Sequence, residues 1–343
     1  MLTTNGKYEI GSEFWDVPFI DIDNDIFKKD THWYISGTAA LESIIEDILS
    51  HNNIRTVAIP SWCCSCMYKP FLKRGIKVLF YPVIFDNGKL VCDYSGTIAD
   101  CWIIMSFFGY STCETIGKPK GLIICDLTHS IFTGTNEYAD YYFGSLRKWA
   151  GFYTGGFAWS NTWFSDKKVP SCDPYYIFLR SQAMKEKNEY IKGDSDSKHY
   201  LYLFEKGEVF LDNCEIMAAY EMDIHKARHL DVKRIIKQRQ NNAKVLLETL
   251  NKWALFPEID YTDCPMFVPI LLENEKRTTL HSYLKRNNIF LPIHWPLDNN
   301  RILSDKEKEL YLGELSVVCD QRYDEEDMQH LVTVIKDAKI LEF

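Results

Sequence analysis

The chain has 343 residues, a formal net charge of −9, 46% hydrophobic residues and 14% aromatic residues. This length exceeds that of one ordinary hydrophobic core, so we expect two closely packed lobes. The negative charge argues against a nucleic-acid partner, because binding to phosphates requires a basic surface. No stretch approaches the roughly 18 consecutive apolar residues of a membrane helix, so we expect no association with a membrane.

The N-terminal residues and the cysteines indicate the compartment. The N-terminus, which includes Glu9 and Glu13, lacks the basic-then-apolar order of a signal peptide, so we expect a cytoplasmic protein. The 11 cysteines are spread over the whole length, which is typical of reduced and mostly buried thiols. Three of them cluster at Cys63, Cys64 and Cys66, but no second Cys or His pair stands at zinc-ligand spacing. We therefore predict no metal site.

The first half of the chain reads as an α/β sheet. After a polar N-terminal arm, a predicted helix starts near residue 36, with Ser36 or Thr38 as its cap. Its apolar positions recur at helical spacing, at Leu41, Ile44, Ile45, Ile48 and Leu49. Short apolar runs follow at residues 57–59, 78–83, 102–107 and 122–125. Near-continuous hydrophobicity of this kind predicts strands that are covered on both faces.

The second half of the chain predicts a smaller lobe. The composition turns polar at residues 194–197, and a long charged helical pattern runs from about 224 to 250. We place the lobe boundary there, with residues 1–225 in the large lobe and 226–343 in the small one. The remainder alternates strand-like and helical segments, at residues 266–272, 277–286, 316–319 and 325–338. This alternation favours a small α/β lobe that ends in a helix.

Gly37 and Thr38 form a candidate anion site. The glycine permits close backbone approach, and the threonine offers a hydroxyl. The helix that starts there points its free N–H groups and the positive end of its dipole at the same place. A phosphate group would suit this site, although the same residue types also serve as an ordinary helix cap.

Asp126 ends the apolar run at residues 122–125, so we expect it at the carboxyl end of a buried strand. Open α/β sheets bind their ligands at that edge. A carboxylate there needs a cationic partner, and a protonated pyridine nitrogen is one; the alternative is a cap of the following turn. His129, three residues further on, either reaches the same ring or is a hydrogen-bonded core histidine.

Lys148 follows an apparent strand at residues 141–146 and is flanked by Arg147 and Trp149. Desolvation and neighbouring positive charge activate a lysine amine for Schiff-base formation. Ser145, three residues earlier, places a hydroxyl within reach of the same phosphate. A lone lysine is usually an exposed and solvated side chain, so the assignment depends on the joint pattern with Asp126 and the anion site.

This joint pattern resembles the fold-type I pyridoxal phosphate (PLP) enzymes, and in particular the DegT-like sugar aminotransferases. The resemblance covers nearly all of the chain. The matching segments are residues 36–41 for the phosphate-binding helix start, 60–62 for the loop that stacks on the cofactor, 126–129 for the Asp-x-x-His element, Lys148 for the Schiff-base lysine and 155–156 for a glycine turn. Residues 291–296 are similar to the segment that approaches the substrate, which makes His294 and Trp295 candidates for substrate binding, with Arg322 as a further anion contact.

The chain departs from the family pattern at several positions. Phe143 stands where the family usually has a phosphate-binding serine, and the spacing of Ser145 is that of other fold-type I aminotransferases. The residue that stacks on the cofactor ring stays open among Trp62, Cys64 and Phe107. The segment between residues 109 and 126 is short, so we expect a trimmed covering helix there.

The resemblance implies a large lobe with a mostly parallel, seven-stranded sheet covered by helices, a smaller C-terminal α/β lobe and a homodimer. It also implies a PLP-dependent aminotransferase that moves an amino group from glutamate or glutamine to a keto-sugar, which we expect to be nucleotide-linked, for polysaccharide or secondary-metabolite biosynthesis. Lys148 and Asp126 would be its catalytic residues. The alternatives are a PLP-dependent sugar dehydratase, which in this family typically has histidine in place of the lysine, another fold-type I enzyme, or a non-catalytic protein that binds a sugar or a partner protein.

Overall fold

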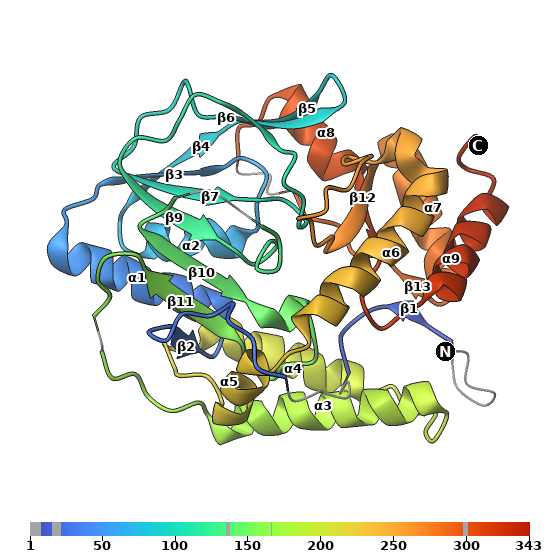
Figure 1. Cartoon of the computed structure of the whole chain (residues 1–343), viewed down its shortest axis with the longest axis horizontal. Helices are drawn as coiled ribbons and strands as arrows, with labels where there is room; N and C mark the ends of the chain where they lie inside the picture. The colour runs from blue at the N-terminus through green and yellow to red at the C-terminus, as the bar shows by residue number, and fades with distance from the viewer. Residues whose placement is uncertain (1–7, 16–21, 135–137, 166, 298–300) are drawn as a thin grey trace.

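The computed structural model describes residues 8–15, 22–134, 138–165, 167–297 and 301–343. A seven-stranded sheet in the order β2-β11-β10-β9-β7-β3-β4 forms its centre (Figure 1). In that order the strands span His32–Tyr34, Gly156–Ser160, Tyr141–Ser145, Leu122–Asp126, Cys101–Met105, Thr56–Pro60 and Lys77–Tyr81. β11 runs antiparallel to both of its neighbours, and the other neighbouring strands are parallel. The expected mostly parallel, seven-stranded sheet is therefore confirmed.

Helices pack against the large sheet, and its central strands are buried. Every residue of β7 and of β11 is buried. The helix α1 (Gly37–His51) packs against β10 and β11, and α2 (Ser65–Lys73) packs against β3 and β4. A strand with both faces covered needs apolar side chains at successive positions, and that requirement produces the pattern seen in the sequence.

A helical hairpin extends the large lobe on one side. Its helices α3 (Pro174–Lys192) and α4 (His199–Asn213) lie side by side (Figure 1). They share a small core of Leu179, Ala183, Met184, Tyr190, Tyr200, Leu203 and Phe204. The buried Lys187 of α3 forms an ion pair with the buried Glu9, and this pair ties the N-terminal arm to the hairpin.

A second, three-stranded sheet was not expected from the sequence. It consists of β5 (Val83–Asp86), β6 (Lys89–Asp93) and β8 (Glu114–Ile116). β8 lies in the short segment where we expected a trimmed covering helix, and residues 110–121 contain no helix at all. The run at residues 78–83 is divided between β4 and β5, because Pro82 separates the two strands.

The helical pattern expected from residue 224 to residue 250 forms two helices, so the expectation of one long helix was wrong. They are α5 (Glu221–Arg228) and α6 (Val232–Leu250). Asp231 separates them, because its side chain accepts a hydrogen bond from the backbone N–H of Arg234 and so caps the start of α6.

The C-terminal part of the chain has its own hydrophobic core. β12 (Phe267–Leu271) pairs antiparallel with β14 (Glu314–Val318), and α6, α7 (Asn274–Arg286) and α9 (Glu325–Asp337) pack around them. The N-terminal arm joins this core, because β1 (Ile10–Gly11) pairs with β13 (Ile289–Phe290). In the other direction, α8 (Asp305–Gly313) returns to the large lobe, where Lys306 forms an ion pair with Asp86 of β5 at 2.6 Å. The lobe boundary at residues 225 and 226 stays a prediction.

None of the helices within the described ranges is long and apolar enough to cross a membrane.

The approach of β11 to the start of α1 can be tested by one added methyl group. A Cβ atom at Gly156 would lie 2.0 Å from the carbonyl oxygen of Ser36, so we expect Gly156→Ala to lower the free energy of unfolding by about 2 kcal/mol or more. Urea denaturation measures this change. Gly96→Ala is the matched control, because a Cβ atom there meets nothing within 4 Å. Equal midpoints for the two variants would contradict the close approach.

Candidate active site

The candidate residues for chemistry converge at one edge of the large sheet. Asp126 is the last residue of β9, and Ser145 is the last residue of the adjacent parallel strand β10. A short 3-10 helix, η1 (Leu146–Lys148), continues directly from β10 and carries Lys148. Because parallel strands end at the same edge of a sheet, Asp126 and Lys148 come together although they are far apart in the sequence.

The start of α1 forms an anion cradle beside this edge. The side chain of Ser36 accepts a hydrogen bond from the N–H of Ala39 at 3.1 Å, and its carbonyl accepts one from the N–H of Ala40. The helix itself offers no acceptor to the N–H groups of Gly37 and Thr38. A Cβ atom at Gly37 would lie 3.2 Å from the Cβ of Ser145, so the serine adjoins this helix start. The expected phosphate-binding residues therefore lie together.

Asp126 is a buried carboxylate whose hydrogen bonds, among the described residues, come from Thr128. Its Oδ1 accepts the N–H of Thr128 at 2.8 Å, and the side chain is 6% exposed. Burial raises the pKa of Asp126, whereas the hydrogen bonds from Thr128 and the positive charge of Lys148 act in the opposite direction. A cation beside Asp126 would relieve this cost of burying its charge.

His129 contains a buried ring nitrogen that has no partner in the described protein. The residue is 1% exposed, and its Nδ1 neither accepts nor donates a hydrogen bond among the described residues. The ring stacks on Trp295 with centroids 5.6 Å apart and planes at 17°. Burial, together with the positive charge of Lys148, holds the pKa of His129 well below 6.5, so the imidazole is neutral. An unpartnered polar atom in such a site marks a place for a ligand.

The three candidates for stacking on a cofactor ring have different surroundings. Trp62 and Phe107 stack on each other, with centroids 5.3 Å apart and planes at 12°, and both are fully buried. Cys64 is partly exposed at the start of α2 and interacts electrostatically with Lys148 and Asp126. Cys64 therefore lies close enough to Lys148 and Asp126 to interact with their charges.

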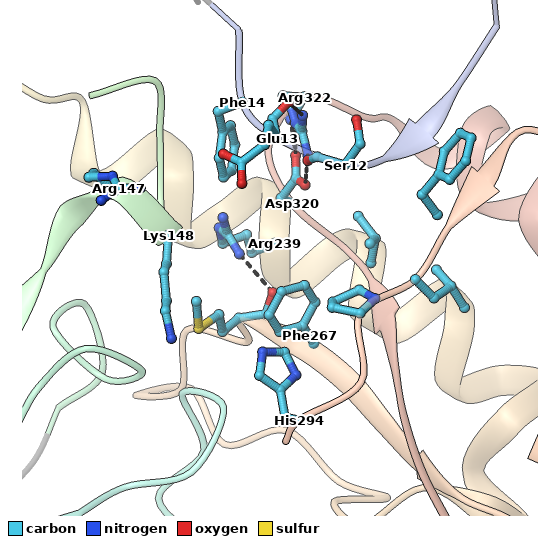
Figure 2. A pocket seen from close by; sticks show the side chains of 15 residues that line it. Ser12, Glu13, Phe14, Arg147, Lys148, Arg239, Phe267, His294, Asp320 and Arg322 are labelled. Carbon is cyan, nitrogen blue, oxygen red and sulfur yellow. Dashed lines mark hydrogen bonds and ion pairs between the residues drawn. The ribbon is translucent and has the colours of Figure 1, made fainter. Parts of the chain in front are cut away.

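A pocket of about 460 Å³ opens in front of Lys148 (Figure 2). Three segments line it, namely the N-terminal arm at residues 12–14, the Lys148 segment and the C-terminal lobe. Figure 2 shows the side chains of Lys148 and His294 entering it from different segments. Trp295 is 7% exposed and packs in the aromatic cluster beneath, edge-on to Trp62 at 5.5 Å. His294 thus meets the pocket directly, and Trp295 supports the cluster behind it.

Arg322 lines the same pocket, but its guanidinium is engaged within the protein. It forms an ion pair with the buried Asp320 at 2.8 Å and donates hydrogen bonds to the carbonyls of Ser12 and Glu13. Arg322 therefore holds the N-terminal arm against the C-terminal lobe. Its predicted contact with a substrate anion stays a prediction.

Sequence reasoning missed Glu314 and Ser316, which lie directly behind His294. Glu314 is fully buried, and its carboxylate accepts hydrogen bonds from the backbone N–H of His294 at 2.6 Å and from the hydroxyl of Ser316. A signal was present, because a glutamate opens the apolar run that forms β14. Buried acidic residues are rare unless they are paired or functional.

Comparison with known proteins gives a match in structure but not in sequence. No protein-family model and no curated protein matches the chain. Spr1654 of Streptococcus pneumoniae, a candidate sugar aminotransferase in its PLP-form, has a TM-score of 0.65 at 14% identity, over 98% of this chain and 100% of that one. PseC of Helicobacter pylori, an aminotransferase involved in the biosynthesis of pseudoaminic acid, has a TM-score of 0.66 at 12% identity, over 96% and 99%. The sugar aminotransferase CalS13 of Micromonospora echinospora reaches 0.58 at 13% identity, over 90% and 87%.

These matches confirm the fold class that the sequence resemblance implied. At such low identity they describe the fold and not the activity of this chain. The coverage is nearly complete in both directions for the first two proteins, so the N-terminal arm, the large sheet and the C-terminal lobe all have counterparts.

The thiol of Cys64 provides a test of the electrostatics around Lys148. A hydrogen bond from Cys66 and the positive charge of Lys148 lower the pKa of Cys64 to about 6, against the effect of burial. We therefore expect iodoacetamide to alkylate Cys64 with a midpoint near pH 6, since the thiolate is the nucleophile. Lys148→Met should raise this midpoint. Peptide mapping by mass spectrometry measures the rate at each pH.

Cys172 is the internal control for this measurement. It is also partly exposed, but burial raises its pKa to about 12, so it should stay unmodified at pH 7. A Cys64 midpoint that does not move in Lys148→Met would show that the lysine charge does not reach the thiol.

Proposed function

We propose that this chain is a PLP-dependent aminotransferase that transfers an amino group from an amino acid to a keto-sugar. The observation that carries the proposal is the meeting of Lys148, the buried carboxylate of Asp126 and the start of α1 at one sheet edge. The fold adds support, because it is that of sugar aminotransferases matched in PLP-form and PMP-form.

The residues present fit pyridoxal phosphate. The N–H groups at Gly37 and Thr38 and the hydroxyl of Ser145 suit its phosphate, because they combine a helix N-terminus with neutral donors. The buried Asp126 suits a protonated ring nitrogen, which would supply the cation that the carboxylate lacks. The unpartnered Nδ1 of His129 suits a polar substituent of the ring.

When bound, this cofactor supplies an aldehyde that joins to amines and a ring that withdraws electrons from the carbon next to the nitrogen. Lys148 Nζ would hold this cofactor and, once released, would be the base that moves a proton of the amino donor. Asp126 would pair with the ring nitrogen and favour its protonated form. Cys64, whose thiol interacts with the charges of Lys148 and Asp126, would lie beside the ring.

The finer parts of the function rest on the resemblance to the DegT-like family. We propose glutamate or glutamine as the amino donor and a nucleotide-linked keto-sugar as the acceptor. The apolar side chains of Phe267, Leu291 and Val318 in the pocket provide a surface for the carbon face of a sugar ring. The lysine at position 148 favours transamination over dehydration, because the dehydratases of the family typically lack it.

We also propose a homodimer. The helical hairpin exposes large apolar side chains to solvent, among them Tyr175 and Phe178 of α3 and Leu201 and Tyr202 of α4. Each of the four is more than half exposed, with fractions from 52% to 56%. A second copy of the chain that covers this surface would remove apolar area from water.

The covalent role of Lys148 can be tested on the purified protein. We expect a yellow protein that loses its colour on treatment with borohydride, and peptide mapping should find the reduced cofactor on Lys148. Lys148→Ala should fold and lose the adduct, whereas Lys118→Ala, which changes an exposed lysine, should keep it. A colourless protein that takes up no added PLP would favour a non-catalytic binding protein instead.

The acceptor can be tested with the protein loaded with pyridoxamine phosphate. We expect a nucleotide-linked keto-sugar to restore the absorbance of the PLP-form, and mass spectrometry should find nitrogen in the sugar product. A product that has lost water and contains no nitrogen would identify a dehydratase. If no keto-sugar in a broad set reacts while amino acids do, the acceptor proposed here is wrong.

A further inference from the structure

A chain of hydrogen bonds leads from the pocket into the C-terminal lobe. Nδ1 of His294 lies 2.9 Å from the hydroxyl oxygen of Ser316, and the Ser316 hydroxyl in turn bonds to Oε1 of Glu314. The other oxygen of Glu314, Oε2, accepts the backbone N–H of His294 at 2.6 Å. The three side chains therefore form one connected line, His294 to Ser316 to Glu314.

The outer end of this line reaches the pocket and the inner end is sealed. His294 lines the pocket, and Figure 2 shows its ring on the side that faces Lys148. Within the described part of the chain, Nε2 of His294 has no hydrogen-bond partner. Ser316 and Glu314 are both 0% exposed, so neither side chain contacts solvent directly, and the line connects Glu314 to the pocket.

Besides Lys148, the charged side chains of Glu13, Arg147, Arg239, Asp320 and Arg322 line the same pocket as His294. Two groups lie near His294, which is the end of the line at the pocket. They are Lys148 and the neutral ring of His129, whose centroid is 5.6 Å from that of His294. Arg277 of α7 is the charged group that interacts with Glu314, and its guanidinium also donates to the carbonyl of Tyr311 at 3.2 Å. Arg277 and Lys148 are the charged groups that act on the pKa values of Glu314 and His294, respectively.

The line has two proton arrangements that use the same heavy-atom contacts. With Glu314 ionised, Ser316 donates to Glu314 and Nδ1–H of His294 donates to Ser316, so Nε2 offers a lone pair to the pocket. With Glu314 protonated, Glu314 donates to Ser316, Ser316 donates to Nδ1, and Nε2 carries a hydrogen. The protonation state of the buried carboxyl therefore sets the hydrogen-bond polarity at the pocket.

We propose that Glu314, Ser316 and His294 form a proton relay that carries one proton between the pocket and the buried carboxyl. In the forward direction an N–H or O–H bond in the pocket breaks and its proton binds Nε2. The Nδ1 proton passes to Ser316, and the Ser316 proton passes to Oε1 of Glu314. One proton enters and one carboxylate is neutralised, and the reverse shift returns the proton to the pocket.

The acidities along the line support this direction of transfer. Burial raises the pKa of Glu314 to about 8, against the effects of the hydrogen bonds and of Arg277. Burial and the charge of Lys148 lower the pKa of His294 to about 3. The proton therefore rests on Glu314 and passes through His294 without leaving a stable imidazolium there.

The role of the relay in catalysis rests on the proposed function. An amino donor arrives as an ammonium ion and must lose a proton before its nitrogen can attack, and Lys148 is occupied with the cofactor at that moment. The lone pair of Nε2 in the same pocket can take this proton. His294 would then act on the substrate directly, whereas Ser316 and Glu314 act through it as positioning residues.

The test is the tautomer of His294, read by NMR in the full-length protein with 15N-labelled histidine. The chain has 9 histidines, and His294→Gln assigns the signal. We expect Nε2–H below about pH 8 and Nδ1–H above it, following Glu314. His281 is the internal reference, because its Nε2 bonds to the carbonyl of Leu291 and should keep one tautomer throughout.

Two variants separate the relay from simple packing. Glu314→Gln must place its NH2 group toward Ser316, because the other position accepts the N–H of His294, so it should lock His294 as Nε2–H at every pH. Ser316→Ala should disconnect the histidine, whose tautomer then no longer follows Glu314. A tautomer of His294 that is independent of pH in the unaltered protein, or one that still switches in Glu314→Gln, overturns the relay.

The kinetic consequence is tested on the holoenzyme. In single turnovers with the amino donor, we expect the unaltered protein to speed up as the pH rises through about 8, and Glu314→Gln to lose this rise and to be about 100-fold slower at high pH. An unchanged pH profile in Glu314→Gln would overturn the relay as a path for the donor proton. The tautomer measurement needs no cofactor and no substrate, so it decides on the relay even if the proposed activity fails.

Discussion

An exposed lysine, Lys148, surrounded by ionisable side chains that are largely buried, organises the pocket of this protein. Its positive charge acts on four ionisable groups from three other parts of the chain, namely Cys64, Asp126, His129 and His294. Burial is the largest cause of the pKa shifts of Asp126, His129 and His294, and a hydrogen bond from Cys66 is the largest cause for Cys64; the charge of Lys148 also acts on each of them. The two histidines become neutral hydrogen-bonding groups, and the thiol becomes acidic. This arrangement suits chemistry in which protons move while net charge stays low.

The backbone explains why these side chains meet. Parallel strands end at one edge of the sheet, so Asp126 of β9 and Lys148 after β10 converge, and the close approach of Gly156 to Ser36 brings the start of α1 to the same edge. The opposite wall of the pocket belongs to the C-terminal lobe. The N-terminal arm, held by Arg322, closes the remaining side. The pocket therefore depends on the packing of three segments that are distant in the sequence.

Sequence reasoning recovered the buried strands and α1, and it missed the three-stranded sheet and the break between α5 and α6. The buried strands and α1 were predictable because burial on both faces and helical spacing leave direct patterns. The three-stranded sheet escaped because its strands are short and partly exposed. The break between α5 and α6 also escaped, although Asp231 supplies the local cap that causes it. The family resemblance made Trp62 and Phe107 candidates for a ring stack, and the structure shows that they stack on each other.

The sequence by itself determined the parts of the site that lie at strand ends and helix starts, because apolar periodicity and capping residues predict those positions. It identified Asp126, Lys148 and the helix start at Gly37 as groups that belong together. Only the tertiary structure decided which side chains are free to act, because hydrogen-bond partners and burial depend on contacts across the chain. In the tertiary structure, Arg322 forms an ion pair with Asp320, Nδ1 of His129 has no partner among the described residues, and the buried Glu314 lies behind His294.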